Sequence, residues 1–451
     1  MKHKLQERDS KHIWHPCSQM KDYETFKPIP IKKGHGVYLE DFDGNTYIDA
    51  VSSWWVNLFG HCNPRINDAL KKQVDTLEHV IFANFTHEPA VELSERIVSV
   101  TPEGLNKVFF ADNGSSAIEV ALKLSYQYHQ QTGNPDKKKL VSITNAYHGE
   151  TIGALSVGKC DLYTATYKSI MLDTFTATGP DCYRCPHGKE RETCQAECFE
   201  DMERIVKDHH GEIAGIVIEP MVQCAAGMMM YSPVYLKKLR EVCTAYNIHF
   251  IADEIAVGFG RTGKMFACEH ADVSPDMMTV SKGLTAGYLP LALTLVTDQI
   301  YNAFYDDYET LKAFLHSHSY TGNPLACAVA VETLKIFEDQ PVLEENEKKA
   351  AYIREKALST FASLPWFGEF RQLGMIGAIE LVEDQESKIG FDWKERVGYQ
   401  IYQKALEQGV LLRPLGNILY FMFPYVITED QIDQVFDVAK SCTLAYFKER
   451  K

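Results

Sequence analysis

Residues 213–218 read Ile-Ala-Gly-Ile-Val-Ile, and residues 248–252 read Ile-His-Phe-Ile-Ala. Each run is short and apolar almost throughout, whereas a strand with one face in water would alternate apolar and polar residues. Similar runs lie at 108–111 and 140–143, and an amphipathic stretch at 116–124 follows the first of them. Such runs are typical of strands that helices cover on both faces. The middle of the chain therefore predicts an α/β fold with a mainly parallel, doubly wound sheet.

The two ends of the chain have a different pattern. Residues 30–50 contain alternating strand-like segments separated by glycine-containing turns, which is a hairpin pattern. Helical stretches dominate from about residue 336 onward. We predict a large domain of residues 66–335 and a small α+β domain built from residues 1–65 and 336–451.

The composition limits the classes of function that the chain can have. It has 451 residues, 45% of them hydrophobic and 24% charged, which is ordinary for a globular protein. No apolar stretch approaches the roughly 20 residues needed to span a bilayer, and residues 1–9 lack the apolar core of a secretion signal. We expect a cytoplasmic enzyme without a membrane partner. The net charge of -15 argues against a nucleic-acid partner, and the twelve scattered cysteines are expected to be free thiols.

Two polar residues stand at the ends of apolar runs. Asp253 ends the run at 248–252, where open α/β sheets place their ligands, and Lys282 closes a later run. A lysine that forms a Schiff base and an aspartate that keeps a pyridine nitrogen protonated are the two residue types that a pyridoxal phosphate enzyme needs. Taken singly, Asp253 would equally suit a helix cap, and Lys282 would suit a solvated surface.

Two further motifs suit the same cofactor. Residues 112–116 read Asp-Asn-Gly-Ser-Ser between an apolar run and a helix, so Gly114 and Ser115 can offer donors to a phosphate at the helix N-terminus. An ordinary N-capped helix is the alternative for these residues. Tyr147 precedes His148 and Gly149 and can stack its ring on a flat cofactor, although a packing role in a loop is the alternative.

Four motifs in this order resemble the signature of the class III aminotransferases, which are fold-type I, pyridoxal-phosphate-dependent enzymes. They are Asp253-Glu254-Ile255, Gly258-Phe259-Gly260-Arg261-Thr262-Gly263, Ser281-Lys282-Gly283 and Tyr320-Thr321-Gly322-Asn323-Pro324. The resemblance implies that Lys282 carries the cofactor, that Asp253 binds the pyridine nitrogen and that Tyr147 stacks on the ring. It assigns the phosphate to Gly114 and Ser115.

The same resemblance implies residues that the patterns alone would not indicate. Glu219 and Gln223 resemble the family's pair near the cofactor ring. Ser319 stands where members usually have a threonine that reaches the phosphate of the neighbouring subunit, and a serine keeps the hydroxyl. The family is dimeric with shared active sites, so a homodimer is expected.

Other segments resemble one branch of this family, the adenosylmethionine-8-amino-7-oxononanoate aminotransferases of biotin biosynthesis, which make 7,8-diaminononanoate. The segments are residues 11–16, 52–55, 265–270 and 412–416. The keto substrate of that branch is a long aliphatic chain ending in a carboxylate, so it needs an apolar wall and a distant cation. Trp54 and Trp55 can supply the wall, and Arg413 can clamp the carboxylate. The alternative is that both tryptophans are core residues and that Arg413 forms a surface ion pair, and without the resemblance the core role is favoured for the tryptophans.

Three positions depart from the pattern of that branch. Cys17 replaces a tyrosine credited with substrate recognition, His318 replaces a proline typical of adenosylmethionine-using members, and Glu150 replaces an aspartate. The surroundings of His318 resemble members that use lysine, so the amino donor is either S-adenosylmethionine or lysine. The predicted substrate-binding set comprises Cys17, Trp54, Tyr147, Lys282, Ser317 and Arg413.

Four cysteines in a polar loop have the spacing of thiolate ligands. Cys182 and Cys185 form one close pair, and Cys194 and Cys198 form the second. Such pairs can bind zinc or an iron–sulfur cluster, and some related class III enzymes hold such a cluster between subunits. Others carry similar insertions without a metal, and Cys-x3-Cys without histidine is a weak zinc pattern. We predict that no metal binds here.

The predicted function is transamination of 8-amino-7-oxononanoate to 7,8-diaminononanoate with small-molecule substrates. One alternative is another class III enzyme, an ω-amino acid aminotransferase or an aminomutase, which would use the same cofactor site with a different pocket. A second alternative is a non-catalytic metal- or partner-binding protein on the same scaffold. The joint presence of Lys282, Asp253 and Tyr147 argues against the second.

Overall fold

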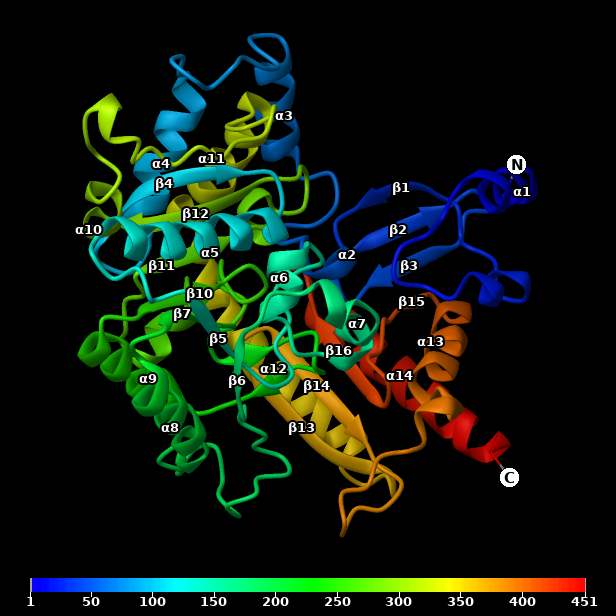
Figure 1. Cartoon of the computed structure of the whole chain (residues 1–451). Coiled ribbons are helices and arrows are strands. Elements are labelled where there is room, and N and C mark those ends of the chain that lie inside the picture. The colour runs from blue at the N-terminus through cyan, green and yellow to red at the C-terminus, as the bar shows by residue number, and fades with distance from the viewer. Residues whose placement is uncertain (1, 451) are drawn as a thin grey trace.

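The centre of the molecule is a seven-stranded sheet in the order β4-β12-β11-β10-β7-β5-β6 (Figure 1). The computed structural model describes residues 2–450. Its strands are β4 (Leu105–Ala111), β5 (Lys139–Ile143), β6 (Phe175–Ala177), β7 (Ile213–Ile218), β10 (His249–Asp253), β11 (Met277–Val280) and β12 (Ala292–Thr297). Strand β12 runs antiparallel to both of its neighbours, and the other pairs are parallel. The predicted mainly parallel α/β fold is confirmed.

Helices cover both faces of this sheet, which is why its strands are apolar throughout. Helix α5 (Gly114–Gln131) crosses one face (Figure 1). Met277 packs in the same cluster as Ile118 of α5, whereas its neighbour Met278 packs in a cluster with Leu93 on the opposite face. The other helices of this region are α3 (Pro64–Val74), α4 (Glu88–Val100), α6 (Ile152–Val157), α7 (Asp161–Thr164), α8 (Glu200–His209), α9 (Pro233–Tyr246), α10 (Asp298–Asn302) and α11 (Pro324–Asp339).

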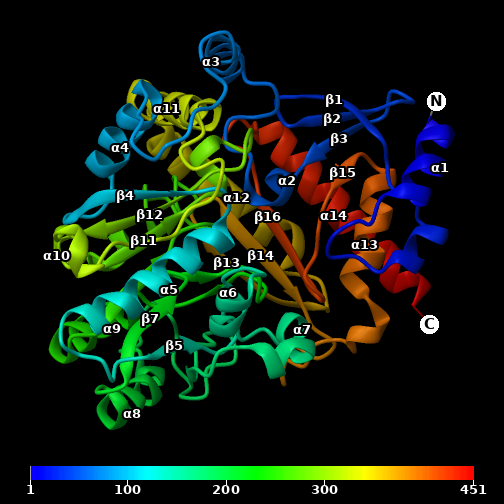
Figure 2. The ribbon, with the colours of Figure 1, turned by 45° about the horizontal axis from the view of Figure 1, so that its top comes forward.

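Segments from the two ends of the chain share a second sheet, in the order β1-β2-β3-β15. The hairpin pattern at 30–50 forms β1 (Ile31–His35), β2 (Tyr38–Asp41) and β3 (Thr46–Asp49), and β15 (Val410–Leu411) joins β3 in parallel, with Val410 opposite Ile48. Both termini lie on this side of the molecule (Figure 2). This pairing supports a small domain built from both ends, although its limits remain predictions, and the one at residue 336 falls inside α11.

The remaining elements complete the C-terminal region and the short connections. They are the sheet of β13 (Phe367–Leu373), β14 (Ile376–Leu381) and β16 (Ile418–Met422), the hairpin of β8 (Val222–Gln223) and β9 (Met229–Met230), and helices α1 (Lys2–His12), α12 (Val342–Phe361), α13 (Val397–Glu407) and α14 (Glu429–Glu449). Short 3-10 helices are η1 (Met20–Glu24), η2 (Ala165–Ile170), η3 (Glu197–Phe199), η4 (Ala267–Ala271), η5 (Lys282–Thr285), η6 (Tyr308–Thr310) and η7 (Trp393–Glu395). None of the helices within residues 2–450 combines the length and apolarity needed to cross a membrane.

One turn has an unusual backbone. The segment α2 (Ser52–Trp55) has positive φ at all four residues, from 46° at Ser53 to 73° at Trp55. Asp49 holds it, since its carboxylate accepts hydrogen bonds from the Ser53 backbone N–H (2.9 Å) and hydroxyl (2.6 Å). Left-handed backbone costs about 1–3 kcal/mol for each non-glycine residue and is typical of functional sites. The turn therefore directs attention to the two tryptophans that it carries.

Candidate active site

Lys282 and Asp253 line one cavity of about 180 Å³ at the carboxyl ends of the central strands of the large sheet. Asp253 is the last residue of β10, and Lys282 begins η5 just after β11, which runs parallel to β10. The carboxyl ends of neighbouring parallel strands thus bring the two side chains together, where open α/β sheets bind ligands. The predicted residues that also line this cavity are Gly114, Ser115, Tyr147 and Glu219.

The environment of Lys282 favours the neutral amine. Burial lowers the pKa of Lys282, and the nearby Asp253, Cys224 and Glu219 oppose that effect only in part. The amine lies 5.1 Å from the ring centre of Trp55, whose side chain is buried. A lowered pKa makes the neutral, nucleophilic amine more accessible than it is for an exposed lysine.

A histidine that we did not predict holds Asp253. The Asp253 Oδ2 atom lies 2.7 Å from Nδ1 of His148, and Oδ1 accepts the backbone N–H of Ile255 at 3.1 Å. Both Asp253 and His148 are buried. The His148 Nε2 atom is buried and has no hydrogen-bond partner among residues 2–450. These contacts engage both carboxylate oxygens and fix the orientation of Asp253 at the cavity. The position of His148 next to Tyr147 was the signal that could have revealed it.

The predicted phosphate turn is the first turn of the 18-residue helix α5. Asn113 caps this helix through its side chain, and Ser115 Oγ accepts the backbone N–H of Glu150 at 3.0 Å. A Cβ atom on Gly149 would lie 2.0 Å from Ser115 Oγ, and one on Gly114 would press on Ile255, so both glycines keep the turn close to its neighbours. The first-turn N–H groups therefore line the cavity at the positive end of a long helix, which suits an anion.

Glu219 connects two loops of the site. Its Oε1 atom accepts the backbone N–H of Tyr147, and its Oε2 atom accepts that of Cys224, both at 2.9 Å. Burial raises the pKa of Glu219 to about 7, with His148 and Asp253 acting in opposite directions. A carboxylate in this position can therefore change its charge near neutral pH.

Tyr147 and Gln223 also lie beside the site. The Tyr147 hydroxyl donates to Glu150 Oε1 at 2.9 Å, so Glu150, which replaces an aspartate, contacts a residue of the cavity without lining the cavity itself. Gln223 is buried and donates to the carbonyl of Thr144 at 2.9 Å, while its Oε1 atom is buried without a partner in the described part of the chain. Gln223 does not line the Lys282 cavity, whereas Tyr147 does.

A second cavity of about 600 Å³ contains two of the other predicted substrate residues. Arg413 and Cys17 both line it. The Arg413 guanidinium lies 4.1 Å from the ring centre of Trp54, which is 39% exposed. Partial burial and the charge of Glu150 raise the pKa of the Cys17 thiol, and Arg413 opposes them. The neighbouring tryptophans thus have different partners, since Trp54 lies against Arg413 without lining its cavity, and Trp55 lines the Lys282 cavity.

Two predicted residues lie elsewhere in this chain. Ser317 and Ser319 are exposed in the segment 311–319 that precedes α11, and neither lines the cavities of Lys282 and Arg413. A role for Ser319 at the neighbouring subunit remains a prediction, and so does a substrate contact of Ser317.

The four cysteines of the polar loop are free thiols. Burial is the main cause that raises the pKa of Cys182 to about 12 and that of Cys198 to about 11. Within residues 2–450, no group of three or more histidine, cysteine, aspartate or glutamate side chains is arranged to hold a metal ion. The absence of a metal from this loop remains a prediction.

Comparison with known proteins agrees with this geometry. Residues 19–442 match the family model of the class III aminotransferases. The adenosylmethionine-8-amino-7-oxononanoate aminotransferase of Geobacter sulfurreducens is 46% identical over 434 residues, with 96% of each chain covered. The enzyme of the same name from Helicobacter pylori is 45% identical, with 94% of each chain covered.

Solved structures give the same result. The crystal structure of the enzyme of that name from Methanocaldococcus jannaschii has a TM-score of 0.93 and 36% sequence identity, with coverage of 98% of this chain and 99% of that one. An omega transaminase from Pseudomonas jessenii in complex with PMP has a TM-score of 0.93 at 29% identity, with 99% and 98% covered. The chain belongs to the class III aminotransferases, a family of pyridoxal-phosphate-dependent enzymes.

Proposed function

We propose that this aminotransferase transfers an amino group from S-adenosylmethionine to 8-amino-7-oxononanoate and so produces 7,8-diaminononanoate for biotin biosynthesis. The names of its relatives support both substrates. The observation that carries the proposal is Arg413, which stacks on Trp54 in a large cavity. Lysine is the alternative donor, because Cys17 and His318 depart from the pattern of adenosylmethionine-using members.

Pyridoxal phosphate fits the Lys282 cavity. The N–H groups of Gly114 and Ser115 would hold its phosphate, Asp253 its pyridine nitrogen and Tyr147 one face of its ring, while Lys282 supplies the amine that anchors it. The buried His148–Asp253 pair fits this assignment, because an oriented carboxylate is what a pyridinium nitrogen needs. When bound, the cofactor supplies a carbonyl for the amino group and an electron sink for the carbon that loses a proton.

The protein's own groups would then position and move protons. Lys282 Nζ accepts the proton from the donor carbon in the first half of the transfer and donates a proton to the acceptor carbon in the second. Burial suits it to this role because it lowers the pKa of the amine. His148 keeps Asp253 in place, and Glu219 keeps the Tyr147 loop against the cavity. Trp55 excludes water from the amine that it covers.

The acceptor would bind across the two cavities. Its carboxylate would lie on Arg413 and its aliphatic chain along Trp54, so that its ketone reaches Lys282. A guanidinium with a planar fork suits a carboxylate better than an ammonium does. The distance between the charged end and the reacting carbon would select long keto acids over short ones.

The test is a donor and acceptor screen with the purified, cofactor-loaded enzyme. We expect mass spectrometry to detect diaminononanoate when 8-amino-7-oxononanoate is incubated with S-adenosylmethionine, and we expect a much lower rate with lysine. A higher rate with lysine would reassign the donor. Transfer to pyruvate but not to 8-amino-7-oxononanoate would indicate an ω-amino acid aminotransferase, and isomerisation of a single amino compound would indicate an aminomutase.

We also propose a cytoplasmic homodimer. The segment that holds Ser319 exposes large apolar side chains, with Leu311 77%, Leu315 90% and Tyr320 65% exposed, and a second copy would cover them. All twelve cysteines are free, which suits a reducing compartment. Light scattering should give twice the mass of the chain, and a monomer that is fully active would contradict the shared site.

A further inference from the structure

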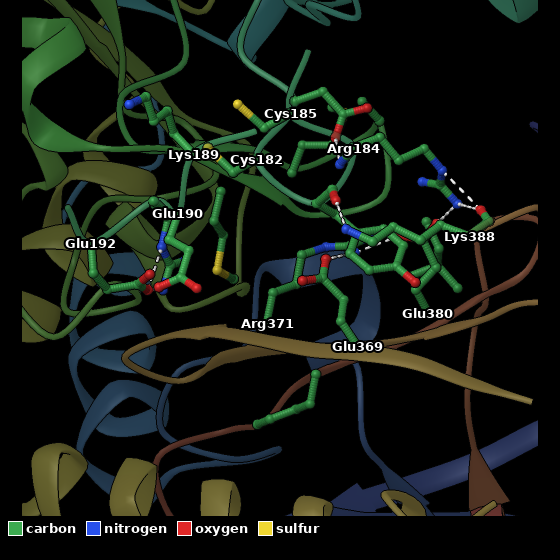
Figure 3. A pocket seen from close by; sticks show the side chains of 18 of the residues that line it. Cys182, Arg184, Cys185, Lys189, Glu190, Glu192, Glu369, Arg371, Glu380 and Lys388 are labelled. Carbon is green, nitrogen blue, oxygen red and sulfur yellow. Dashed lines mark hydrogen bonds and ion pairs between the residues drawn. The ribbon is translucent and has the colours of Figure 1, made fainter. Parts of the chain in front are cut away.

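A buried arginine lies in a third cavity, of about 640 Å³, beneath the cysteine loop (Figure 3). Arg371 stands on β13, is 8% exposed, and points its Nη1 atom between two acids. Glu369 Oε1 and Glu380 Oε2 each lie 2.6 Å from that nitrogen. Arg184 of the cysteine loop contacts the other oxygen of Glu380 at 2.5 Å. The two carboxylates leave the rest of the Arg371 guanidinium available for other partners.

Those other donors hold the turn between β8 and β9. Arg371 Nε donates to the carbonyl of Met228 at 2.9 Å, and Nη2 donates to that of Gly227 at 2.5 Å. Both residues have positive φ, 57° at Met228 and 96° at Gly227. A Cβ atom on Gly227 would lie 2.3 Å from Cδ1 of Ile418, so the turn is packed tightly as well as strained. Arg371 therefore stabilises a turn that would otherwise relax.

This turn extends to the cofactor site. The N–H groups of Gly227 and Met228 donate to the carbonyl of Cys224 at 3.2 and 3.1 Å. The N–H group of Cys224 donates in turn to Glu219 Oε2 at 2.9 Å, and Glu219 Oε1 accepts the N–H of Tyr147. Cys224 is thus held on both sides of its Cα atom, by the turn at its carbonyl and by Glu219 at its N–H, so the position of the turn determines where this N–H lies.

We propose that Arg371 is a positioning residue of the cofactor site: it fixes the turn at 224–228 so that the Cys224 N–H remains on Glu219. The proposal rests on the assignment of Glu219 to the pyridoxal phosphate pocket. A purely structural role, in which Arg371 only neutralises Glu369 and Glu380, would not require the two bonds to the turn.

The hydrogen bond from the Cys224 N–H affects the charge of Glu219. Besides the N–H groups of Cys224 and Tyr147, the titratable groups that face this carboxyl include His148, Asp253, Lys282 and the thiols of Cys224 and Cys160. The Cys224 N–H favours the ionised form, so its loss raises the pKa of Glu219 further. The ionised form holds the Tyr147 loop against the cavity, and cofactor affinity should therefore rise with pH across that pKa.

Cofactor binding without substrate tests the proposal. We would measure the dissociation constant of pyridoxal phosphate from pH 6 to 9 by fluorescence for the wild type, R371K and the triple variant R371M/E369Q/E380Q. The triple variant leaves no unpaired buried charge. Hydrogen exchange of the peptide that contains residues 224–228 would be followed in parallel. R184M is the matched control, because it removes the other arginine on Glu380 and leaves the turn contacts intact.

We expect R371K and the triple variant to bind the cofactor about tenfold more weakly at pH 7, because one hydrogen bond to a charged group is lost. The midpoint of the pH dependence should move up by about one pH unit, the turn should exchange faster, and R184M should match the wild type. Introducing E219Q should abolish the shift. An unchanged midpoint in both Arg371 variants, or a shift that persists with E219Q, would overturn the proposal. Failure of the wild type to convert 8-amino-7-oxononanoate would instead refute only the proposed substrate.

Discussion

Arg413 is predicted to bind the carboxylate of the acceptor, and Arg413→Met tests this at nearly constant side-chain length. In the structure the guanidinium stacks on Trp54 at 4.1 Å. Arg413 also lines the cavity of about 600 Å³, where a ligand can reach it. A carboxylate would form two charge-assisted hydrogen bonds along the N–H edge of the guanidinium. At about 1.5 kcal/mol each, at the lower end because the cavity is open, their loss totals about 3 kcal/mol. We therefore expect kcat/KM for 8-amino-7-oxononanoate to fall by about 150-fold.

The assay measures kcat/KM at saturating donor for 8-amino-7-oxononanoate and for its methyl ester. The ester lacks the charge, so its kcat/KM should be low in the wild type and nearly unchanged in R413M. The control is R396M, because Arg396 lines the same cavity and stacks on Tyr399 at 3.9 Å, but pairs with Asp22 at 2.7 and 2.9 Å. We expect less than a fivefold effect from R396M. Equal losses with acid and ester, or a larger effect from R396M, would refute the assignment.

Four further outcomes are expected. Lys282→Ala should abolish multiple turnover and remove the visible absorption of the bound cofactor, and a variant that still cycles would contradict the central assignment. His148→Phe should lower kcat about tenfold by releasing Asp253, with H148N restoring part of the rate if the contact at 2.7 Å is what matters. Burial raises the pKa of Glu219 from 4.5 to about 7. The stability that this group contributes to the apoprotein is therefore present below pH 4.5 and is lost as the pH rises to about 7. Between these two pH values the melting temperature of E219Q should fall less than that of the wild type. Zinc and iron analysis of the purified protein should find no stoichiometric metal, and one metal per chain would reverse the prediction for the cysteine loop.

The large sheet could be predicted because strands that are buried on both faces are composed almost entirely of apolar residues. The apolar runs at 213–218 and 248–252 became β7 and β10, with helices on both faces. The antiparallel direction of β12 could not be read in the same way, because an apolar strand has the same composition in either direction. Direction depends on the path of the chain between 281 and 291, which the sequence pattern of β12 does not describe.

Residues of the site could be predicted where a motif implied their type. Residues whose role depends only on their position in space could be predicted less well. Lys282, Asp253 and Tyr147, which motifs singled out, line one cavity together with Glu219, which only the family resemblance implied. The partner of Asp253 was missed, because a histidine beside an aromatic residue has many ordinary explanations until its Nδ1 is seen at 2.7 Å from the carboxylate.

The two tryptophans show most clearly what only the structure could add. Trp54 lies against the Arg413 guanidinium, and the next residue, Trp55, lies beside the amine of Lys282, although Arg413 and Lys282 line separate cavities. The left-handed backbone of Ser52–Trp55 makes this possible and costs on the order of 4 kcal/mol or more over its four residues. The bonds of Asp49 to Ser53, and of Ser52 Oγ to the carbonyl of Met422 at 2.6 Å, offset part of that cost. A core role would need only one buried ring and no strain. The turn instead places one aromatic ring beside the Lys282 amine and the next against the Arg413 guanidinium, and we predict that this spacing sets the length of the substrate that the enzyme binds.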